Sequence, residues 1–200
     1  MNYNYIAPFY DSLSRISFLN NQQKAHYPIL PFIKNDMRIL WIGGGSGWFL
    51  KDIDQLNLNL QIDYVEFSSA MMKAAKARKL NFTQVNFIQE DIFKYQLTEK
   101  YDLIITAFFF DHFKDEECIA LFERLNQSLK NKGFWFYVEF NQNQNFIQRF
   151  ITKAMVLFFN CVAGIKNQDF PKIEYLFDHY QKIEDYYYFG NYIVSRIYQK

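Results

Sequence analysis

Three closely spaced glycines and one acid are the residues of this chain whose types and spacing best suit ligand chemistry. Gly43, Gly45 and Gly47 follow the largely apolar run 38–42, and Glu66 ends the next such run along the chain. Glycine in a turn lets the backbone approach a ligand because no Cβ stands in the way. A carboxylate at a strand tip can accept hydrogen bonds from both hydroxyls of a ribose. The order strand, glycine turn, helix, strand and acid therefore predicts a nucleoside-binding half of a doubly wound α/β fold.

Trp48 helps to distinguish two classes of nucleotide-binding glycine turn. The dinucleotide pattern Gly-x-Gly-x-x-Gly would place its third glycine at this position, and a pyrophosphate favours the free amides of a helix N-terminus. Over residues 43–47 the chain instead has Gly-x-Gly-x-Gly. This pattern resembles motif I of the class I S-adenosylmethionine-dependent methyltransferases, whose ligand carries no phosphate. A nicotinamide oxidoreductase is disfavoured by the same spacing.

Further segments resemble this family in the expected order, so that the resemblance covers about residues 5–140. They are 66–71, 85–92, 101–107 and 125–140, the last with a turn at 129–134. Ser68 or Ser69 is expected to cap the helix that follows Glu66. The pattern Ala-x-x-Tyr-Asp at 7–11 is similar to the N-terminal lid of ubiquinone/menaquinone-type and related small-molecule methyltransferases.

The resemblance implies cofactor contacts spread over the lid, the glycine turn and the ends of the next three strands. They are Tyr10, Gly43, Gly45, Gly47, Glu66, Phe67, Met71, Asp91, Ile92 and Phe108. In the family, the acid matching Glu66 binds the ribose and the one matching Asp91 contacts the adenine amino group beside apolar walls. The ring of Tyr10 would lie near the sulfonium, where it can favour positive charge by about 0.5–2 kcal/mol; alternatively, it attaches the lid to the core. The implied cofactor is S-adenosylmethionine.

Trp41 is the main departure from the family pattern. The residue two before the first glycine is usually an acid that helps to hold the methionine ammonium group. With tryptophan at this position, the ammonium must be held differently or less tightly. Alternatively, Trp41 is a core residue at the end of a strand.

Asp111 and His112 are the candidate catalytic residues. They lie in the loop after the fourth expected strand, where many small-molecule members of the family have His-His-Leu. Ligands of open α/β sheets gather at the carboxyl ends of the strands, which is where this loop must lie. His112 could be a general base because its pKa lies near the working pH. It could equally cap the helix beginning near Lys114 or pack against the cofactor, and Asp111 has similar alternatives.

The expected architecture is α/β, with a doubly wound, Rossmann-like sheet of seven mostly parallel strands, a C-terminal antiparallel hairpin and helices on both faces. Two hundred residues suffice for one such domain. Its expected parts are a helical lid over 1–35, a cofactor-binding core over 36–140, and a helix plus hairpin over 141–200. Within the last part we expect a helix at 144–165, a short helix at 171–179 with Pro171 in its first turn, and strands at 180–189 and 192–199 about Gly190-Asn191.

Composition argues against several other classes of protein. The net charge of +1, with both signs interspersed, gives no basic stripe for nucleic acid. The three histidines are widely separated, so no metal site is expected. Two isolated cysteines and the lack of a leader or a long apolar run predict a cytoplasmic protein without a transmembrane segment. It is expected to be a monomer or a homodimer.

The predicted function is S-adenosylmethionine-dependent methyl transfer to a small molecule of apolar or aromatic character. Two alternatives stay open. The first is a different transferase that uses an S-adenosyl ligand, such as an aminopropyltransferase-like enzyme, for which Asp111 and Asp115 are the nearby acids. The second is a non-catalytic binding module that has kept the fold, a reading that Trp41 favours.

Overall fold

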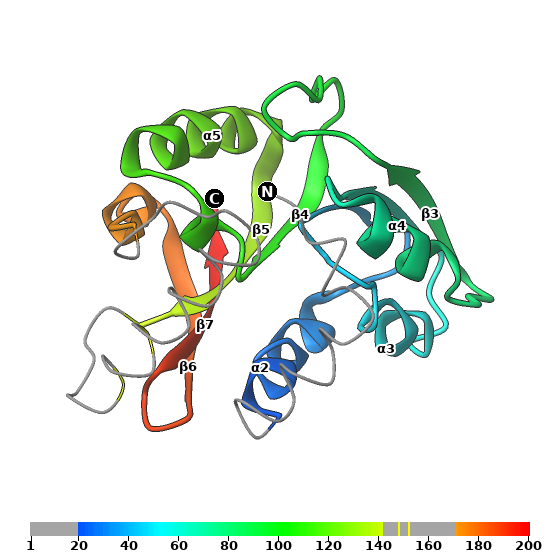
Figure 1. The fold of residues 1–200 in the computed structure, drawn as a ribbon, viewed down its shortest axis with the longest axis horizontal. Coiled ribbons are helices and arrows are strands. Elements are labelled where there is room, and N and C mark those ends of the chain that lie inside the picture. The colour runs from blue at the N-terminus through cyan, green and yellow to red at the C-terminus, as the bar shows by residue number, and fades with distance from the viewer. Residues whose placement is uncertain (1–19, 142–147, 149–151, 153–170) are drawn as a thin grey trace.

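A seven-stranded sheet organises the computed structural model, which describes residues 20–141, 148, 152 and 171–200 (Figure 1). The strand order is β3-β2-β1-β4-β5-β7-β6. The strands are β1 Arg38–Ile42, β2 Leu60–Val65, β3 Thr83–Ile88, β4 Tyr101–Ala107, β5 Leu129–Phe140, β6 Gln181–Tyr188 and β7 Ile193–Gln199. The first five pair in parallel, whereas β7 is antiparallel to both of its neighbours. The expected doubly wound sheet with a C-terminal hairpin is thereby confirmed.

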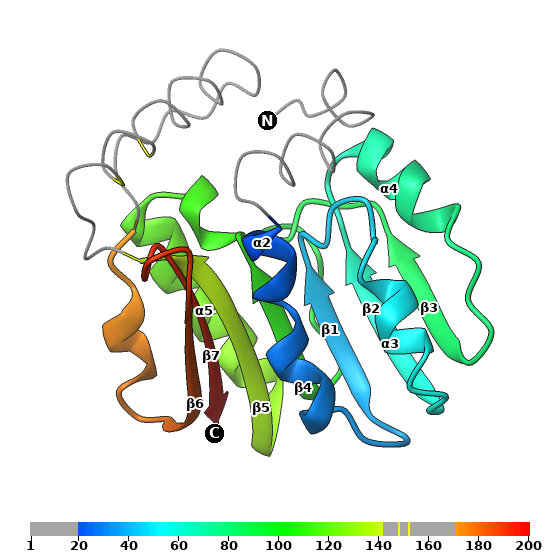
Figure 2. The same ribbon diagram turned by 90° about the horizontal axis from the view of Figure 1, so that it is seen from below.

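The strand order reverses between β1 and β4, and ligands of open α/β sheets bind at such a switch point, beyond the carboxyl ends of the strands. These ends form the carboxyl edge of the sheet, and the opposite side is its amino edge. Figure 2 shows the parallel strands side by side, with α2 and α3 in front of the sheet and α5 behind it. The helical elements are α2 Asn21–Lys24, η2 Tyr27–Phe32, α3 Leu50–Asp54, α4 Ser69–Lys76, η3 Phe110–His112, α5 Asp115–Ser128 and η4 Glu174–Phe177.

Strand β1 contributes to a separate hydrophobic cluster on each face of the sheet. Ile39 and Trp41 belong to the cluster that includes residues of α3 and α4, and Leu40 and Ile42 to the one that includes α5. A parallel strand covered on both faces is expected to be apolar throughout. This explains why the apolar run before Gly43 does not alternate with polar residues.

Three expectations differ from the structure or lie beyond it. The short helix predicted for 171–179 is a 3₁₀ helix at 174–177, so that Pro171 precedes it instead of occupying its first turn. The turn predicted at 129–134 is part of β5, where the ladder to β4 shifts register and Lys132 adopts a φ of 62°. The helix predicted at 144–165 lies largely outside the described residues.

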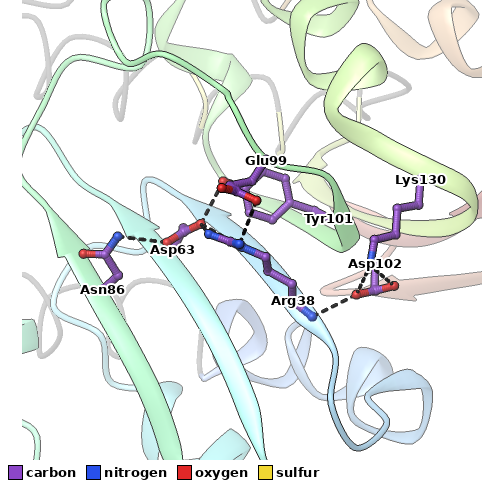
Figure 3. A network of polar contacts seen from close by, with 7 residues as sticks. All are labelled: Arg38, Asp63, Asn86, Glu99, Tyr101, Asp102 and Lys130. Carbon is purple, nitrogen blue, oxygen red and sulfur yellow. Dashed lines mark hydrogen bonds and ion pairs between the residues drawn. The ribbon is translucent and has the colours of Figure 1, made fainter.

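A buried polar network holds the amino edge together (Figure 3). Asp63 accepts hydrogen bonds from the Tyr101 hydroxyl at 2.8 Å, Asn86 Nδ2 at 2.9 Å and Arg38 Nη2 at 3.1 Å. Asp102 accepts the backbone amide of Arg38 at 2.9 Å, which joins the first residue of β1 to β4. A buried carboxylate needs such partners because an unpaired one is costly.

Within the described ranges, no helix combines the length and apolar character needed to cross a bilayer. The same part of the chain contains no group of three metal-ligating side chains.

Candidate functional site

The glycine turn between β1 and α3 has one open position. A Cβ added to Gly45, which has a φ of 60°, would meet nothing within 4 Å. At Gly43 the added atom would lie 2.6 Å from Phe109 Cδ2, and at Gly47 it would lie 2.9 Å from Ala75 Cβ. Gly43 and Gly47 are therefore confined by close packing, whereas Gly45 borders free space that a ligand can fill.

Glu66 joins the tip of β2 to this open position. Its Oε2 accepts the Gly45 amide at 3.1 Å and its Oε1 accepts the Ser68 amide at 2.7 Å. Ser68 caps α4 through a 3.3 Å hydrogen bond from the Met71 amide, as one of the two predicted caps. The carboxyl is buried, and this burial raises the pKa of Glu66 despite the amide hydrogen bonds. An acid beside a bare glycine is suited to accept the hydroxyls of a ribose.

Two side chains from other elements hold the glycine turn in place. The Tyr64 hydroxyl donates to the Gly45 carbonyl at 2.9 Å, and its ring fills the space that a side chain at Gly44 would need. Arg78, just after α4, donates from Nε to the Ser46 carbonyl at 3.1 Å. The turn is thus fixed before any ligand arrives, which lowers the entropic cost of binding.

The segment after β3 contains the predicted adenine contacts. Asp91 Oδ1 accepts the Phe93 amide at 3.0 Å, and the Ile92 side chain is buried. Arg124 on α5 donates to three backbone carbonyls of this segment: those of Ile92 at 3.1 Å, Phe93 at 3.2 Å and Tyr95 at 2.7 Å. The sequence analysis did not identify Arg124, because a single arginine on an amphipathic helix has no distinguishing sequence signal.

Phe108 and Phe109 have different surroundings at the end of β4. Phe108 has a φ of 51°, and its ring lies 5.1 Å from that of Phe140 and 6.0 Å from that of His26. The ring that touches the glycine turn, at Gly43, is the adjacent Phe109. The sequence analysis named Phe108 as a cofactor wall and did not single out Phe109. Because the positive φ of Phe108 turns the chain sharply, spacing alone does not reveal which ring faces the turn.

His112 pairs with its neighbour Asp111. His112 Nδ1 lies 2.6 Å from Asp111 Oδ1 and 3.1 Å from the Phe109 carbonyl oxygen. Both partners are acceptors, so Nδ1 carries a proton. Burial alone would lower the pKa of His112, but the charge and hydrogen bond of Asp111 outweigh it and raise the pKa. His112 does not cap α5, since the Glu117 side chain accepts the amide of the capping residue Lys114 at 3.0 Å.

Glu139, in β5, is a buried acid that the sequence analysis did not identify. Its Oε1 accepts the amides of Phe109 at 2.9 Å and Phe110 at 2.8 Å. Burial, reinforced by the charge of Asp111, raises the pKa of Glu139 well above its usual range. The signal available in the sequence was one acid within the otherwise apolar run 134–140.

Trp41 is a core side chain, 2% exposed, with its ring 6.0 Å from that of Phe49 and 5.4 Å from that of Tyr64. Its Nε1 is buried and has no hydrogen-bond partner among the residues that the structure describes. An indole N–H donates but does not accept, so Trp41 cannot replace an acid in holding an ammonium group. The residues present therefore fit the adenosine part of S-adenosylmethionine better than its amino-acid end.

Of the other predicted contacts, Phe67 and Met71 lie directly after Glu66, in the loop and the first turn of α4. Phe67 is 57% exposed, whereas Met71 is buried. Tyr10 lies outside the described residues. Direct contacts thus link Gly45 to Glu66, Gly43 to Phe109, and Asp111 to His112, around the switch point of the sheet.

Comparison with known proteins supports this assignment. Residues 40–135 match a family model described as a methyltransferase domain. Malonyl-[acyl-carrier protein] O-methyltransferase 2 of Ilyobacter polytropus is 34% identical over 117 residues, which are 58% of this chain and 44% of that protein. The chain therefore spans less than half the length of this curated relative.

Solved structures agree with the fold. The plantazolicin methyltransferase BpumL, in complex with S-adenosylhomocysteine, is 29% identical with a TM-score of 0.52, covering 68% of this chain and 52% of its own. A S-adenosylmethionine-dependent methyltransferase from Archaeoglobus fulgidus matches with a TM-score of 0.68 over 96% of this chain and 100% of its own. At 14% identity, that second match bears on the fold alone. The ubiquinone/menaquinone-like subtype stays a prediction. Strand order, glycine turn and domain model thus agree, and over residues 40–135 the chain is similar to methyltransferase domains of the class I S-adenosylmethionine-dependent type.

Proposed function

We propose that this chain binds S-adenosylmethionine and transfers its methyl group to a small-molecule acceptor. The observation that carries the proposal is the open face of Gly45 directly beside the Glu66 carboxyl. A dinucleotide-binding turn would instead need a third glycine where the chain has Trp48. The printed names of the relatives, which are methyltransferases, support the same activity.

Different residues of the chain would bind the ribose and the adenine of the ligand. Glu66 would bind the ribose, and Asp91 with Ile92 would bind the adenine, on a backbone segment that Arg124 holds in place. Bound S-adenosylmethionine would supply a methyl group already activated on a sulfonium. The protein must then mainly align the acceptor and exclude water, which can contribute about 7–11 kcal/mol.

The acceptor is proposed to be apolar or aromatic in character. Phenylalanines at 108, 109, 110 and 113 flank the Asp111–His112 pair in the sequence, after the carboxyl end of β4. An acceptor that must lose a proton could give it to His112, whose ring is oriented by the contact of Nδ1 with Asp111. The printed name of the curated relative supplies a contrasting acceptor to test, malonyl-[acyl-carrier protein], whose acceptor group is carried by a protein.

Titration calorimetry with S-adenosylhomocysteine tests the cofactor site. We expect Glu66→Gln to weaken binding by about 1.5–3 kcal/mol, because a charged acceptor for the ribose is lost. Glu90→Gln is the matched control, since Glu90 is an exposed acid at the end of the neighbouring strand, and it should bind like the native protein. Equal affinity of the Glu66 variant and the native protein would contradict the assigned site.

A non-catalytic binding module is the second candidate, and Trp41 is the observation that favours it. A native protein that binds neither S-adenosylmethionine nor S-adenosylhomocysteine would establish this alternative over methyl transfer. Binding together with transfer of a labelled methyl group to an acceptor would exclude it.

We further propose that residues 1–200 form one methyltransferase domain, with 1–35 as a helical lid, 36–140 as the cofactor-binding core and 141–200 as a helix and hairpin. Limited proteolysis with and without S-adenosylhomocysteine would test the lid, since bound ligand should protect its cleavage sites. The expected state, a monomer or a homodimer, can be measured by light scattering.

A further inference from the structure

We propose that Glu139 is a positioning residue that fixes the loop between β4 and α5 and thereby sets the geometry of the Asp111–His112 pair. The inference rests on the proposed function, because that loop borders the proposed methyl-transfer site. Glu139 is at the carboxyl edge of the sheet, one residue before the end of β5, and is 5% exposed. It acts through the loop and is not itself assigned a contact with the acceptor.

The first step of the argument is the pattern of backbone hydrogen bonds. The three consecutive backbone amides that follow β4, those of residues 108–110, all donate hydrogen bonds to acceptors on β5. The Val138 carbonyl accepts the Phe108 amide at 2.7 Å, while Glu139 Oε1 accepts those of Phe109 and Phe110 at 2.9 and 2.8 Å. One carboxyl oxygen thus satisfies two buried donors, which would otherwise be costly to bury.

The second step is what this stretch of backbone carries. Phe108 has a positive φ, which is unfavourable for a bulky residue unless its surroundings enforce it. Phe109 places its ring against Gly43 of the cofactor turn and its carbonyl against His112. A shift of these amides would therefore move both the glycine turn and the histidine. Glu139 is the side chain through which β5 controls the two together.

The third step concerns how Glu139 acts. Titratable groups of three elements interact electrostatically with Glu139. Burial raises the pKa of Glu139 well above its usual range, and the charge of Asp111, on the loop, raises it further. Besides burial, Glu139 in turn contributes to the raised pKa values of Tyr137 on its own strand and Cys118 on α5. Oε1 receives both amide donors, and a neutral carboxyl or amide oxygen can accept them as a carboxylate does. These two hydrogen bonds are what the loop requires of Glu139.

This requirement yields a sharp set of variants. Glu139→Gln keeps a group of the same shape whose oxygen can still accept both amides. Glu139→Ala removes the acceptor, and Glu139→Asp withdraws it by one carbon in case the alanine variant fails to fold. Glu99→Gln is the control, because Glu99 is a half-exposed acid paired with Arg38 at the opposite edge.

Two measurements on the full chain detect the effect of the Glu139 variants. The first is calorimetric affinity for S-adenosylhomocysteine. The second is the NMR titration of the His112 ring, which is readily assigned because the chain has three histidines. A merely structural role would lower stability without changing the titration of His112 in the folded protein.

The proposal expects Glu139→Ala and Glu139→Asp to weaken S-adenosylhomocysteine binding roughly tenfold or more, as the loss of two buried hydrogen bonds implies. In both variants the pKa of His112 should move down towards its ordinary value, because the loop no longer holds it against Asp111. Glu139→Gln and Glu99→Gln should match the native protein in both measurements.

The proposal is overturned if Glu139→Gln is as impaired as Glu139→Ala, or if His112 titrates identically in all variants. Failure of the proposed function is separable from these outcomes. In that case the native protein binds no S-adenosylhomocysteine, yet the titration of His112 still reports whether Glu139 sets the loop.

Discussion

At the amino edge of the parallel strands, Asp63 accepts hydrogen bonds from three side chains, whereas at the carboxyl edge Glu66 and Glu139 accept backbone amides. The amino edge also holds three ion pairs, those of Arg38 with Asp63, of Arg38 with Glu99 and of Lys130 with Asp102 (Figure 3). Both edges therefore satisfy their acids. Backbone amides also donate at the amino edge, to Asp102 and Asp54, so that Asp63 is the buried acid there that side chains hold.

This difference indicates which edge of the sheet can bind a ligand. A side-chain network such as that of Asp63 is complete within the protein and leaves little for a ligand to contribute. Acids held by amides keep spare lone pairs, and Glu66 lies close enough to His112 for the two groups to shift each other's pKa. A ligand with hydroxyl donors or a positive charge can then add hydrogen bonds or ion pairs at the carboxyl edge, whereas Asp63 at the amino edge already has its partners within the protein.

The largest expected effect tests the amino edge. Asp63→Ala should lower the free energy of unfolding by about 3–5 kcal/mol, because it leaves buried partners uncompensated. Urea denaturation measures this, with Glu99→Gln as a control at the exposed part of the same network, expected to cost about 0–1 kcal/mol. Loss of less than about 1 kcal/mol in the Asp63 variant would show that this network is not what stabilises the amino edge.

A second effect separates the two histidines of the carboxyl edge. His26 donates from Nδ1 to the Gln22 carbonyl at 2.8 Å and lies against the Trp48 ring, and its burial lowers the pKa of His26 to about 4. The unfolded chain therefore binds a proton before the folded one does. Stability should be full above the ordinary histidine pKa and fall as the pH drops towards 4, by about 3 kcal/mol in total.

Replacing His26 with glutamine should remove that part of the pH dependence. Denaturation curves at several pH values compare the slopes, and His179→Gln is the control because His179 is exposed. A native slope that persists in the His26 variant would assign the acid sensitivity to other groups. His112, with its raised pKa, contributes in the opposite direction: its stabilisation is present at low pH and is lost as the pH rises through that pKa.

The smallest of these effects concerns the segment between β3 and β4, which runs from the carboxyl edge of the sheet to its amino edge. Arg124 donates to the segment that runs from β3 towards β4, and so connects the adenine contacts with the body of the protein. Arg124→Gln should weaken S-adenosylhomocysteine binding by about 1–2 kcal/mol, measured by calorimetry, because the backbone at Ile92 loses its support. Lys94→Gln, an exposed change in the same segment, should leave the affinity as it is. Unchanged affinity of the Arg124 variant would mean that the segment holds its shape without α5.

Much of the fold was predictable from local sequence. The strand over 101–107 was predicted with the bounds it has, and the hairpin about Gly190-Asn191 within two residues at each end. The first is a largely apolar run and the second consists of two segments about a turn, so both signals are local. The predicted 171–179 helix was wrong in type and extent, because only residues 174–177 close a 3₁₀ turn.

The glycine spacing and the acid at Glu66 predicted a nucleoside site, because backbone clearance and strand-tip position follow from local spacing, and the family resemblance implied S-adenosylmethionine. The contact of Phe109 with Gly43, and the hydrogen bonds that Glu139 and Arg124 make to the loops around the site, became visible in the folded structure. Those contacts join residues about thirty or more positions apart along the chain. Hydrogen bonds from one side chain to a distant backbone depend on how strands and helices stack in space, and residue type or spacing does not encode them.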